Sequence, residues 1–201
     1  LSIPVSFQNV FILIGFLSFV AITGLLGINQ QAASQAIIST LFISFLPSNG
    51  FGVAAQTLIG NEVGKNNIAA AKKYGYETAK LATIYTLALS VVFIFFPHLL
   101  LMITTDEVAV IEQALPAIKL AGIAQIFFGA GVVFAYGLQS VGKTYFVMTT
   151  EVITNLLIFV PASYYLGIYL EGGLRGAWSA LILYTTLYLL FMFIKFYKGN
   201  W

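Results

Sequence analysis

An acidic side chain inside a long apolar run is the first feature of this sequence that could do chemistry. Glu151 lies near the start of the apolar run 144–168, and Asn155 follows it about one helical turn later. Inside a membrane, an ionisable side chain is by default a candidate for binding or carrying an ion. We therefore predict that Glu151 is an ion-linked residue. The alternative is that its carboxylate reaches the membrane surface, which would lie within two turns of it.

Amide side chains within the apolar runs form a second group of candidates. Gln8 and Asn9 lie in the first run, and further amides interrupt the later runs. A buried amide must find hydrogen-bond partners, so it either bridges to another helix or lines a wet cavity. Interhelical bonds of this kind are common and average about 0.6 kcal/mol. The residue types alone leave both roles open.

Residue counts exclude several kinds of catalytic and metal site. The sequence has no cysteine and a single histidine, His98. This removes disulfides, thiolate nucleophiles and metal sites built from cysteine or from several histidines. The apolar runs also contain no close pair of carboxylates, so a catalytic triad or metal centre is hard to assemble. We predict that the protein is not an enzyme and holds no cofactor or metal.

The composition is that of a membrane protein. Of 201 residues, 60% are hydrophobic and 8% are charged, against roughly 45–50% and about 25% in a soluble domain. The net charge of +2 forms no basic block, which argues against a nucleic-acid partner. The chain starts at Leu1 without the basic start of a signal peptide. We interpret it as a piece of a longer protein.

Six apolar runs are long enough to cross a bilayer. A helix needs about 20 mainly apolar residues to span some 30 Å of hydrocarbon, and it satisfies its own backbone groups there. We predict an all-α membrane protein, one six-span unit over residues 1–201. The predicted spans are 3–26, 32–60, 80–102, 118–141, 144–168 and 174–196.

Basic residues predict the orientation of these spans. If residue 1 starts on the cytoplasmic side, seven lysines face the cytoplasm and only Lys119 and Arg175 face outward. Such an excess is the usual sign of the cytoplasmic side, so both ends of the chain are expected there. The seven cytoplasmic lysines would be Lys65, Lys72, Lys73, Lys80, Lys143, Lys195 and Lys198.

The second span contains a predicted hinge. Pro47 has no N–H to donate and crowds the carbonyl of Ile43, which usually kinks a helix. Gly50 lies within one turn of it. We predict that Pro47 and Gly50 form the most flexible point of the chain.

Two connecting segments carry further expectations. Asn67 is predicted to cap a helix over 68–80, which either lies along the membrane surface or is the solvated start of the third span. Before the fourth span, a short outer helix is expected to lead into the membrane through Pro116.

The order of these pieces resembles the carboxy-terminal half of a multidrug and toxic compound extrusion (MATE) transporter. The likeness extends over nearly the whole chain and depends on the order of motifs on the spans. These motifs are Ile3-Pro4, AASQAI at 32–37, the glycine-containing stretch 52–65, AAKK at 70–73, YGLQSVGKT at 136–144 and GLRGAW at 173–178. The resemblance implies two six-span lobes around a central cavity, with the amino-terminal lobe absent from this chain.

Four positions depart from the family pattern. The usual arginine-glycine pair at the end of the fourth span is Gln139-Ser140. Sodium-coupled relatives often carry a glutamate in the first span and an aspartate in the fourth, where this sequence has Ile12 and Phe128. The resemblance therefore implies that the coupling carboxylate lies in the other lobe.

The resemblance implies export of amphipathic or cationic organic compounds, in exchange for protons or sodium ions, by alternating access. The implied partners are the other lobe, membrane lipid and a small organic substrate, in a bacterial or archaeal plasma membrane. Under this hypothesis the lobe contributes polar side chains to the cavity wall. The candidates are Gln8, Asn9, Gln35, Asn49, Gln56, Gln125, Tyr136 and Asn155.

Two other functions remain as alternatives. A lipid-linked oligosaccharide flippase of the same superfamily would be expected to carry more basic residues within its spans than this sequence has. A membrane scaffold subunit that does not transport would need no cavity at all.

Overall fold

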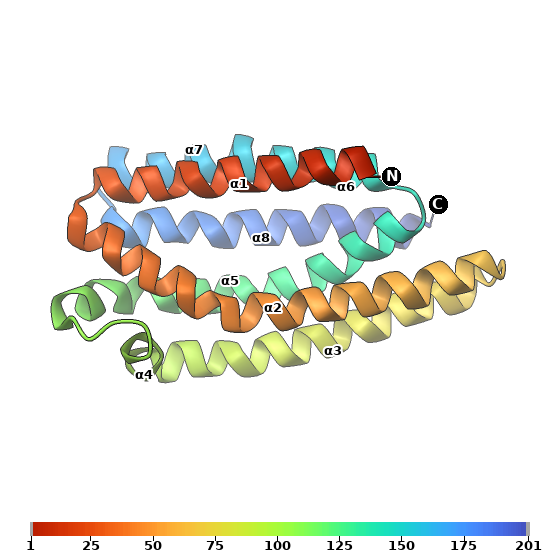
Figure 1. The fold of residues 1–201 in the computed structure, drawn as a ribbon, viewed down its shortest axis with the longest axis horizontal. Helices are drawn as coiled ribbons and strands as arrows, with labels where there is room; N and C mark the ends of the chain where they lie inside the picture. Colours follow the sequence, from red (N-terminus) through yellow and green to blue (C-terminus); the bar gives the residue numbers. More distant parts are fainter. Residues whose placement is uncertain (1, 200–201) are drawn as a thin grey trace.

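The computed structural model of the chain describes residues 2–199 and the side chains of residues 5–199, and this part contains helices and no strand. In chain order, the elements are α1 (Ser2–Leu25), α2 (Ile28–Gly64), α3 (Ile68–Phe95), α4 (Pro97–Met102), α5 (Val108–Ser140), α6 (Thr144–Val152), the π-helix η1 (Ile153–Phe159), α7 (Val160–Tyr164), the π-helix η2 (Tyr165–Tyr169) and α8 (Gly173–Lys198) (Figure 1).

Six stretches of these helices are long and apolar enough to cross a membrane. They are Val5–Leu25, Ile28–Gly64, Ile68–Phe95, Val108–Ser140, Thr144–Tyr169 and Gly173–Lys198. The predicted all-α fold with six spans is therefore confirmed.

Local residue chemistry explains where several helices begin and end. Gly27 and Gly142, at φ angles of 128° and 81°, lie at the turns after α1 and α5, where a side chain would be strained. The Asn67 side chain accepts a 3.1 Å hydrogen bond from the backbone N–H of Ala70. The predicted cap is thus confirmed, and segment 68–80 is the start of the third span.

Two predicted boundaries are wrong. The third span does not continue to residue 102, because α3 ends at Phe95 and Pro97 begins the separate helix α4. Proline disfavours a helical conformation in the residue before it and has no N–H to extend the helix. The fourth span has no separate outer helix in front of it, since α5 runs unbroken from Val108 through Pro116.

The helix α2 also runs unbroken through Pro47 and Gly50, and it bends midway along its length (Figure 1). Because Pro47 lacks an N–H, the Ile43 carbonyl has no partner at the usual place in the helix. The hydroxyl of Tyr85 on α3 donates a 2.8 Å hydrogen bond to that carbonyl. A neighbouring helix therefore satisfies the backbone group that the proline frees. Flexibility at this point stays a prediction.

The helices form two groups that meet along α5 and α8. On one side, α2 and α3 pack against α5, and on the other α1 packs against α6 and η1 beside α8 (Figure 1). The helix α5 contacts α2, α3 and α8 extensively. It is the central element of the described chain.

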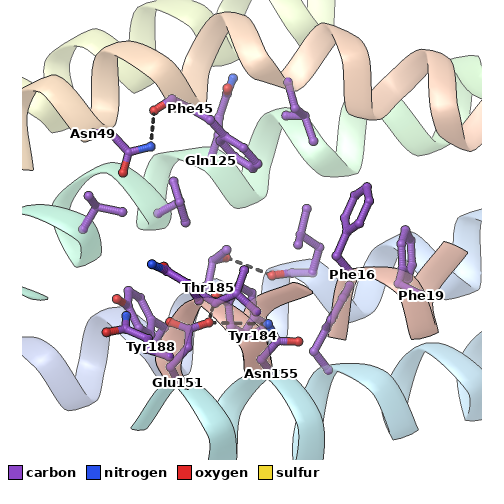
Figure 2. A pocket seen from close by; sticks show the side chains of 18 of the residues that line it. Phe16, Phe19, Phe45, Asn49, Gln125, Glu151, Asn155, Tyr184, Thr185 and Tyr188 are labelled. Carbon is purple, nitrogen blue, oxygen red and sulfur yellow. Dashed lines mark hydrogen bonds between the residues drawn. The ribbon is translucent and has the colours of Figure 1, made fainter. Parts of the chain in front are cut away.

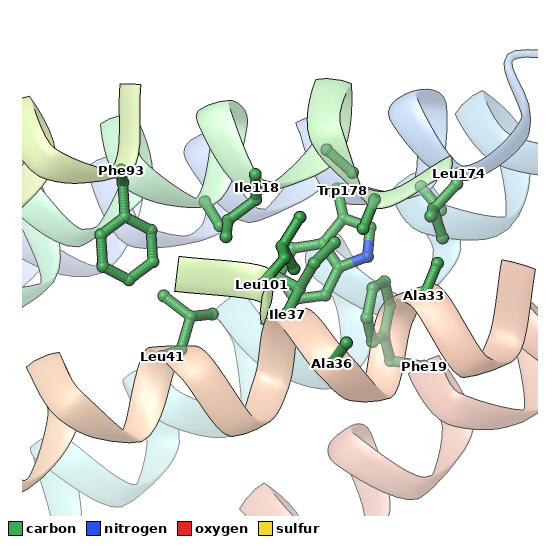
Figure 3. Close-up of a cluster of buried hydrophobic side chains, with 14 of the residues drawn as sticks. Phe19, Ala33, Ala36, Ile37, Leu41, Phe93, Leu101, Ile118, Leu174 and Trp178 are labelled. Carbon is green, nitrogen blue, oxygen red and sulfur yellow. The ribbon is translucent and has the colours of Figure 1, made fainter. Parts of the chain in front are cut away.

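A cluster of buried apolar side chains (Figure 3) lies toward the end of the bundle where α1 leads into α2 and where α8 begins (Figure 1). Its largest member is Trp178 of α8, which is 2% exposed. The ring of Phe19 from α1 meets this indole edge to face, with centroids 5.2 Å apart. Such an aromatic pair contributes about 0.5–1.5 kcal/mol beyond the area it buries. The cluster therefore fixes α1 against α8 at this end.

The opposite end carries most of the lysines. Lys72 of α3 donates to the backbone carbonyl of Tyr197 at 3.5 Å, and Lys195 of α8 lies 5.4 Å above the ring centre of Phe146. The Lys65 ammonium pairs with Glu62 at 2.8 Å, and this hydrogen bond and the charge of Glu62 raise the pKa of Lys65. The helix α1 begins and the helix α8 ends on this side of the bundle (Figure 1).

Candidate functional site

A cavity of about 680 Å³ lies between the two groups of helices. Side chains from α1, α2, α5, α6, η1 and α8 line it (Figure 2). Its polar lining consists of Gln8, Asn9, Asn49, Gln56, Gln125, Tyr136, Gln139, Glu151, Asn155, Tyr184, Thr185 and Tyr188.

The carboxylate of Glu151 is the centre of one polar cluster in this cavity. Its side chain is 2% exposed. The hydroxyl of Tyr184 donates a 2.7 Å hydrogen bond to it, and the Nδ2 of Asn155 donates a longer one of 3.5 Å. Tyr188, one turn after Tyr184 on α8, lies beside the same carboxylate (Figure 2). We call Glu151, Asn155, Tyr184 and Tyr188 the carboxylate cluster.

No basic side chain compensates this acid. Among the described residues that line the cavity, none is lysine, arginine or histidine. The neighbouring helix α1 contains no ionisable residue at all. An ionised carboxylate without a partner is costly away from water. The cluster is therefore suited to bind a positive charge that comes from outside it, as a proton, a metal ion or an organic cation.

The backbone changes its winding next to the cluster. The α-helix α6 passes into the π-helix η1 directly after Val152, and Asn155 belongs to this wider turn. Turns of this kind are rare and occur frequently at functional sites. The Oδ1 atom of Asn155 is buried and has no hydrogen-bond partner in the described chain. This oxygen packs against Gly15 of α1, so one acceptor of the cluster is left unpaired.

Gly15 of α1 allows this arrangement. A Cβ atom at position 15 would collide with the side-chain amide of Asn155. Only a residue without a side chain lets α1 pass this close to η1.

A second polar group ties the other helices together around the cavity. The Nε2 of Gln139 on α5 donates to the Oε1 of Gln8 on α1 at 3.0 Å. The Tyr136 hydroxyl of α5 donates to the Oδ1 of Asn49 on α2 at 3.4 Å. These side chains therefore line the cavity and bridge helices at the same time, so the two roles left open by the sequence are not exclusive.

Gln125 bridges helices within the same wall. It is 2% exposed, and its Oε1 accepts a hydrogen bond from Ser44 of α2. Its Nε2 is buried and has no partner among the described residues. This contact between α5 and α2 is the interhelical bond that the sequence allowed as an alternative for each amide.

Seven of the eight amide and phenol candidates line the cavity, and so does Glu151. The exception is Gln35, which is exposed and does not belong to the lining. Pro47 and Gly50 are also outside it. The described residues contain no group of three histidine, cysteine or acidic side chains that could hold a metal.

The sequence interpretation missed Tyr184, Tyr188 and Gln139. The two tyrosines are four residues apart, which places them on one face of α8. That spacing was a usable signal, but it does not say which helix the face meets. Gln139 appeared as a departure from a family motif, while the structure shows it as a partner of Gln8.

Aromatic rings make up much of the apolar lining. Phe16 and Phe19 lie to one side of the carboxylate cluster, and Phe45 lies across the cavity from it (Figure 2). The apolar rings are Phe16, Phe19, Phe45, Phe128, Phe159 and Trp178.

Comparison with known proteins identifies the family. The sequence model of the MatE family matches residues 4–165. The chain belongs to the MatE family. It is 26% identical over 205 residues to a probable multidrug resistance protein NorM of Thermotoga maritima. This match covers 98% of this chain and 43% of that protein. It is 26% identical over 173 residues to multidrug and toxin extrusion protein 1 of Mus musculus, covering 82% of this chain and 29% of that protein.

Solved structures of transporters have the same fold. A MOP superfamily transporter from Pyrococcus furiosus, whose binding pocket is described as reversed in polarity, superposes with a TM-score of 0.90 at 17% identity. The match covers 100% of this chain and 44% of that one. An outward-facing MATE family transporter gives 0.90 at 16% identity, over 98% and 45%. This MatE chain thus spans less than half the length of these relatives and corresponds to one lobe of a MATE transporter.

Proposed function

We propose that this chain is the carboxy-terminal lobe of a transporter that exports cationic or amphipathic organic compounds. The observation that carries the proposal is the cavity of about 680 Å³, which combines aromatic walls with one buried carboxylate and no basic side chain in the described lining. Cavities of roughly 300–1,000 Å³ suit drug-sized ligands. Relatives are named multidrug resistance or extrusion proteins, which supports this substrate class.

The chemistry of the wall favours positive charge. Aromatic faces attract organic cations by about 0.5–2 kcal/mol each, depending on how far the cation is desolvated. The Glu151 carboxylate adds a full counter-charge in the same space. The amides of the second polar group offer hydrogen bonds in both directions. A flat, apolar compound with a single positive charge therefore meets complementary groups on every side.

Transport requires a second lobe and a driving ion. Two lobes that rock against each other would expose the cavity to one side of the membrane at a time. A gradient of protons or sodium ions supplies the free energy for export. The other lobe and membrane lipid would cover side chains such as Phe7, Leu13 and Leu17, each 55% exposed on α1. The lysine-rich end would face the cytoplasm of a bacterium or archaeon.

An anionic substrate fits the cavity poorly. A lipid-linked oligosaccharide carries phosphate groups, which proteins usually hold with arginine or lysine. The described lining offers a carboxylate instead. The cavity itself argues against a scaffold without a transport role.

Drug resistance of living cells tests this function. The complete coding sequence is expressed in a bacterium whose own exporters are deleted, and growth is measured in ethidium and in tetraphenylphosphonium. We expect several-fold higher tolerance, which Glu151→Gln removes. The matched control Glu112→Gln changes an exposed acid of α5 and should keep the tolerance. Equal growth with and without the protein, at normal amounts of folded protein in the membrane, would refute the proposal.

A further inference from the structure

We propose that the carboxylate cluster is a proton-exchange site within this lobe, in which Glu151 takes up and releases one proton as a cationic substrate leaves and enters. The resemblance to the family implied that the coupling carboxylate lies in the other lobe. The geometry points to a second site here. The link to the substrate depends on the proposed function, while the exchange of the proton itself does not.

The partners of Glu151 suit both of its protonation states. In the ionised state, the carboxylate accepts the 2.7 Å hydrogen bond from Tyr184 and the 3.5 Å one from Asn155. When a proton from cavity water bonds to a carboxylate oxygen, that oxygen becomes a donor. The Tyr184 oxygen can then accept, since a hydroxyl both donates and accepts. The Oδ1 of Asn155 packs against Gly15 of α1, and it becomes another acceptor if the amide turns over.

The same geometry does not suit a sodium ion. A hard metal cation is held by several acceptor oxygens arranged around it. Here the hydroxyl of Tyr184 and the amide nitrogen of Asn155 are directed at the carboxylate as donors. The Nδ2 of Asn155 can only donate and would point hydrogen atoms at a metal ion, so such an ion would find few oxygen ligands besides the carboxylate and a reoriented Tyr184 hydroxyl. A proton needs only the carboxylate itself.

No basic side chain in the described lining of the cavity compensates the charge that Glu151 carries when it is ionised. From α8, the facing titratable groups are Tyr184 and Tyr188, and from α5 it is Tyr136. The packed helix α1 contributes none. The basic residues of α8, Arg175, Lys195 and Lys198, lie near its two ends. Loss of the proton therefore adds one net negative charge to the cavity, and this charge favours entry of an organic cation.

Proton release can be measured directly. The protein made from its complete coding sequence is purified in weakly buffered detergent solution with a pH indicator dye, and tetraphenylphosphonium is added. We expect about one proton released per bound cation near neutral pH. In the pH range where the site is protonated, the affinity for tetraphenylphosphonium should fall about tenfold for each unit by which the pH is lowered. The reason is that the proton and the cation exclude each other. Glu112→Gln should behave like the unchanged protein.

Infrared difference spectra test the site without any substrate. Between high and low pH, the unchanged protein should gain the C=O band of a protonated carboxylic acid, and Glu151→Gln should lack that band. Tyr184→Phe, which keeps the ring and removes the hydroxyl, should shift the band to higher frequency, because the acid loses a hydrogen bond. A purely structural tyrosine would leave the band in place.

Three outcomes would overturn the proposal. In the first, the acid band persists in Glu151→Gln. In the second, cation binding releases no proton although Glu151 is required for it. In the third, sodium at constant pH displaces the organic cation only when Glu151 is present. If tetraphenylphosphonium does not bind at all, the proposed function fails, and the infrared titration still decides whether Glu151 exchanges a proton.

Discussion

The fourth and fifth spans of this protein differ in the regularity of their helical winding and in their burial, and they have different roles. In an 18-residue apolar stretch of α5, 67% of the residues are buried, and the helix winds regularly from Val108 to Ser140. In the span Thr144–Tyr169 the corresponding share is 39%, and two π-helical segments interrupt the α-helix. The carboxylate cluster belongs to the irregular span and to its neighbour α8. The regular helix α5 packs against most of its neighbours, whereas the carboxylate cluster lies next to the π-helical segment η1.

Small residues explain why α5 can be central. Gly122 faces Phe93 of α3, and Gly131 faces Tyr188 of α8. Gly129 faces the backbone carbonyl of Ala82 and the side chain of Thr86. Without side chains at these points, neighbouring helices approach closely, which is how helices associate in lipid. The fifth span uses the same device once, where Gly167 meets Ala177 of α8.

The largest effect should come from damage to α5. In Gly129→Ala, the added Cβ would lie 2.7 Å from the Thr86 methyl and 3.3 Å from the Ala82 carbonyl oxygen. The backbone oxygen cannot move aside, so we expect a loss of about 1–3 kcal/mol in stability. Thermal unfolding in detergent, followed by gel filtration, measures it. The control Gly60→Ala meets its nearest atom at 3.5 Å, and an equal loss there would refute the explanation.

A change at the irregular span should affect the site more than the fold. Gly15→Ala places a methyl group against the amide of Asn155, which must turn away from Glu151. We expect about 1 kcal/mol of lost stability and a clear drop in proton release when tetraphenylphosphonium binds. Gly60→Ala again serves as control. Unchanged proton release in Gly15→Ala would show that Asn155 does not contribute to the cluster.

A smaller effect is expected at the bend of α2. Tyr85→Phe leaves the Ile43 carbonyl without its 2.8 Å hydrogen bond. The loss should be about 0.6 kcal/mol, seen as faster hydrogen exchange of the amides near Pro47 by mass spectrometry. Tyr74→Phe changes an exposed tyrosine on the same helix and should leave the exchange unchanged. Slow exchange around Pro47 in both variants would count against a hinge there.

The smallest effect should be at the second polar group. Gln139→Ala removes the 3.0 Å hydrogen bond to Gln8, which corresponds to about 0.6 kcal/mol or less. Stability should hardly change, while tolerance of ethidium falls modestly if α1 shifts in the cavity. A loss of folded protein as large as in Gly129→Ala would mean that this bond, and not the packing of α1 against α2, α6 and η1, holds α1 in place.

Hydropathy was sufficient to predict the six spans, since a helix that crosses a bilayer must be long and apolar. Hydropathy alone extended the third span to residue 102, because the apolar run continues through Pro97. The amides show the same limit. Gln35 and Gln125 both interrupt apolar runs, yet one is exposed and the other is buried against Ser44. Which way each points depends on how its helix is rotated, and packing decides that.

The partners of Glu151 were beyond the reach of sequence for a related reason. The sequence indicated Asn155, one turn away on the same span. Tyr184 is 33 residues further along the chain, and its contact exists only because α8 presents that face to α6. The π-helical turn at Ile153 carries no proline or glycine to mark it.

The uncompensated carboxylate also makes the lobe sensitive to electrical potential. A charge that moves across a membrane gains or loses about 2.3 kcal/mol per 100 mV. The helix α1 carries no ionisable side chain, so the membrane potential acts on no charged side chain there. In the described cavity lining, the membrane potential acts on Glu151 while its carboxylate is ionised. Protonation removes that charge. Membrane voltage would thus act on this site in one protonation state and not in the other.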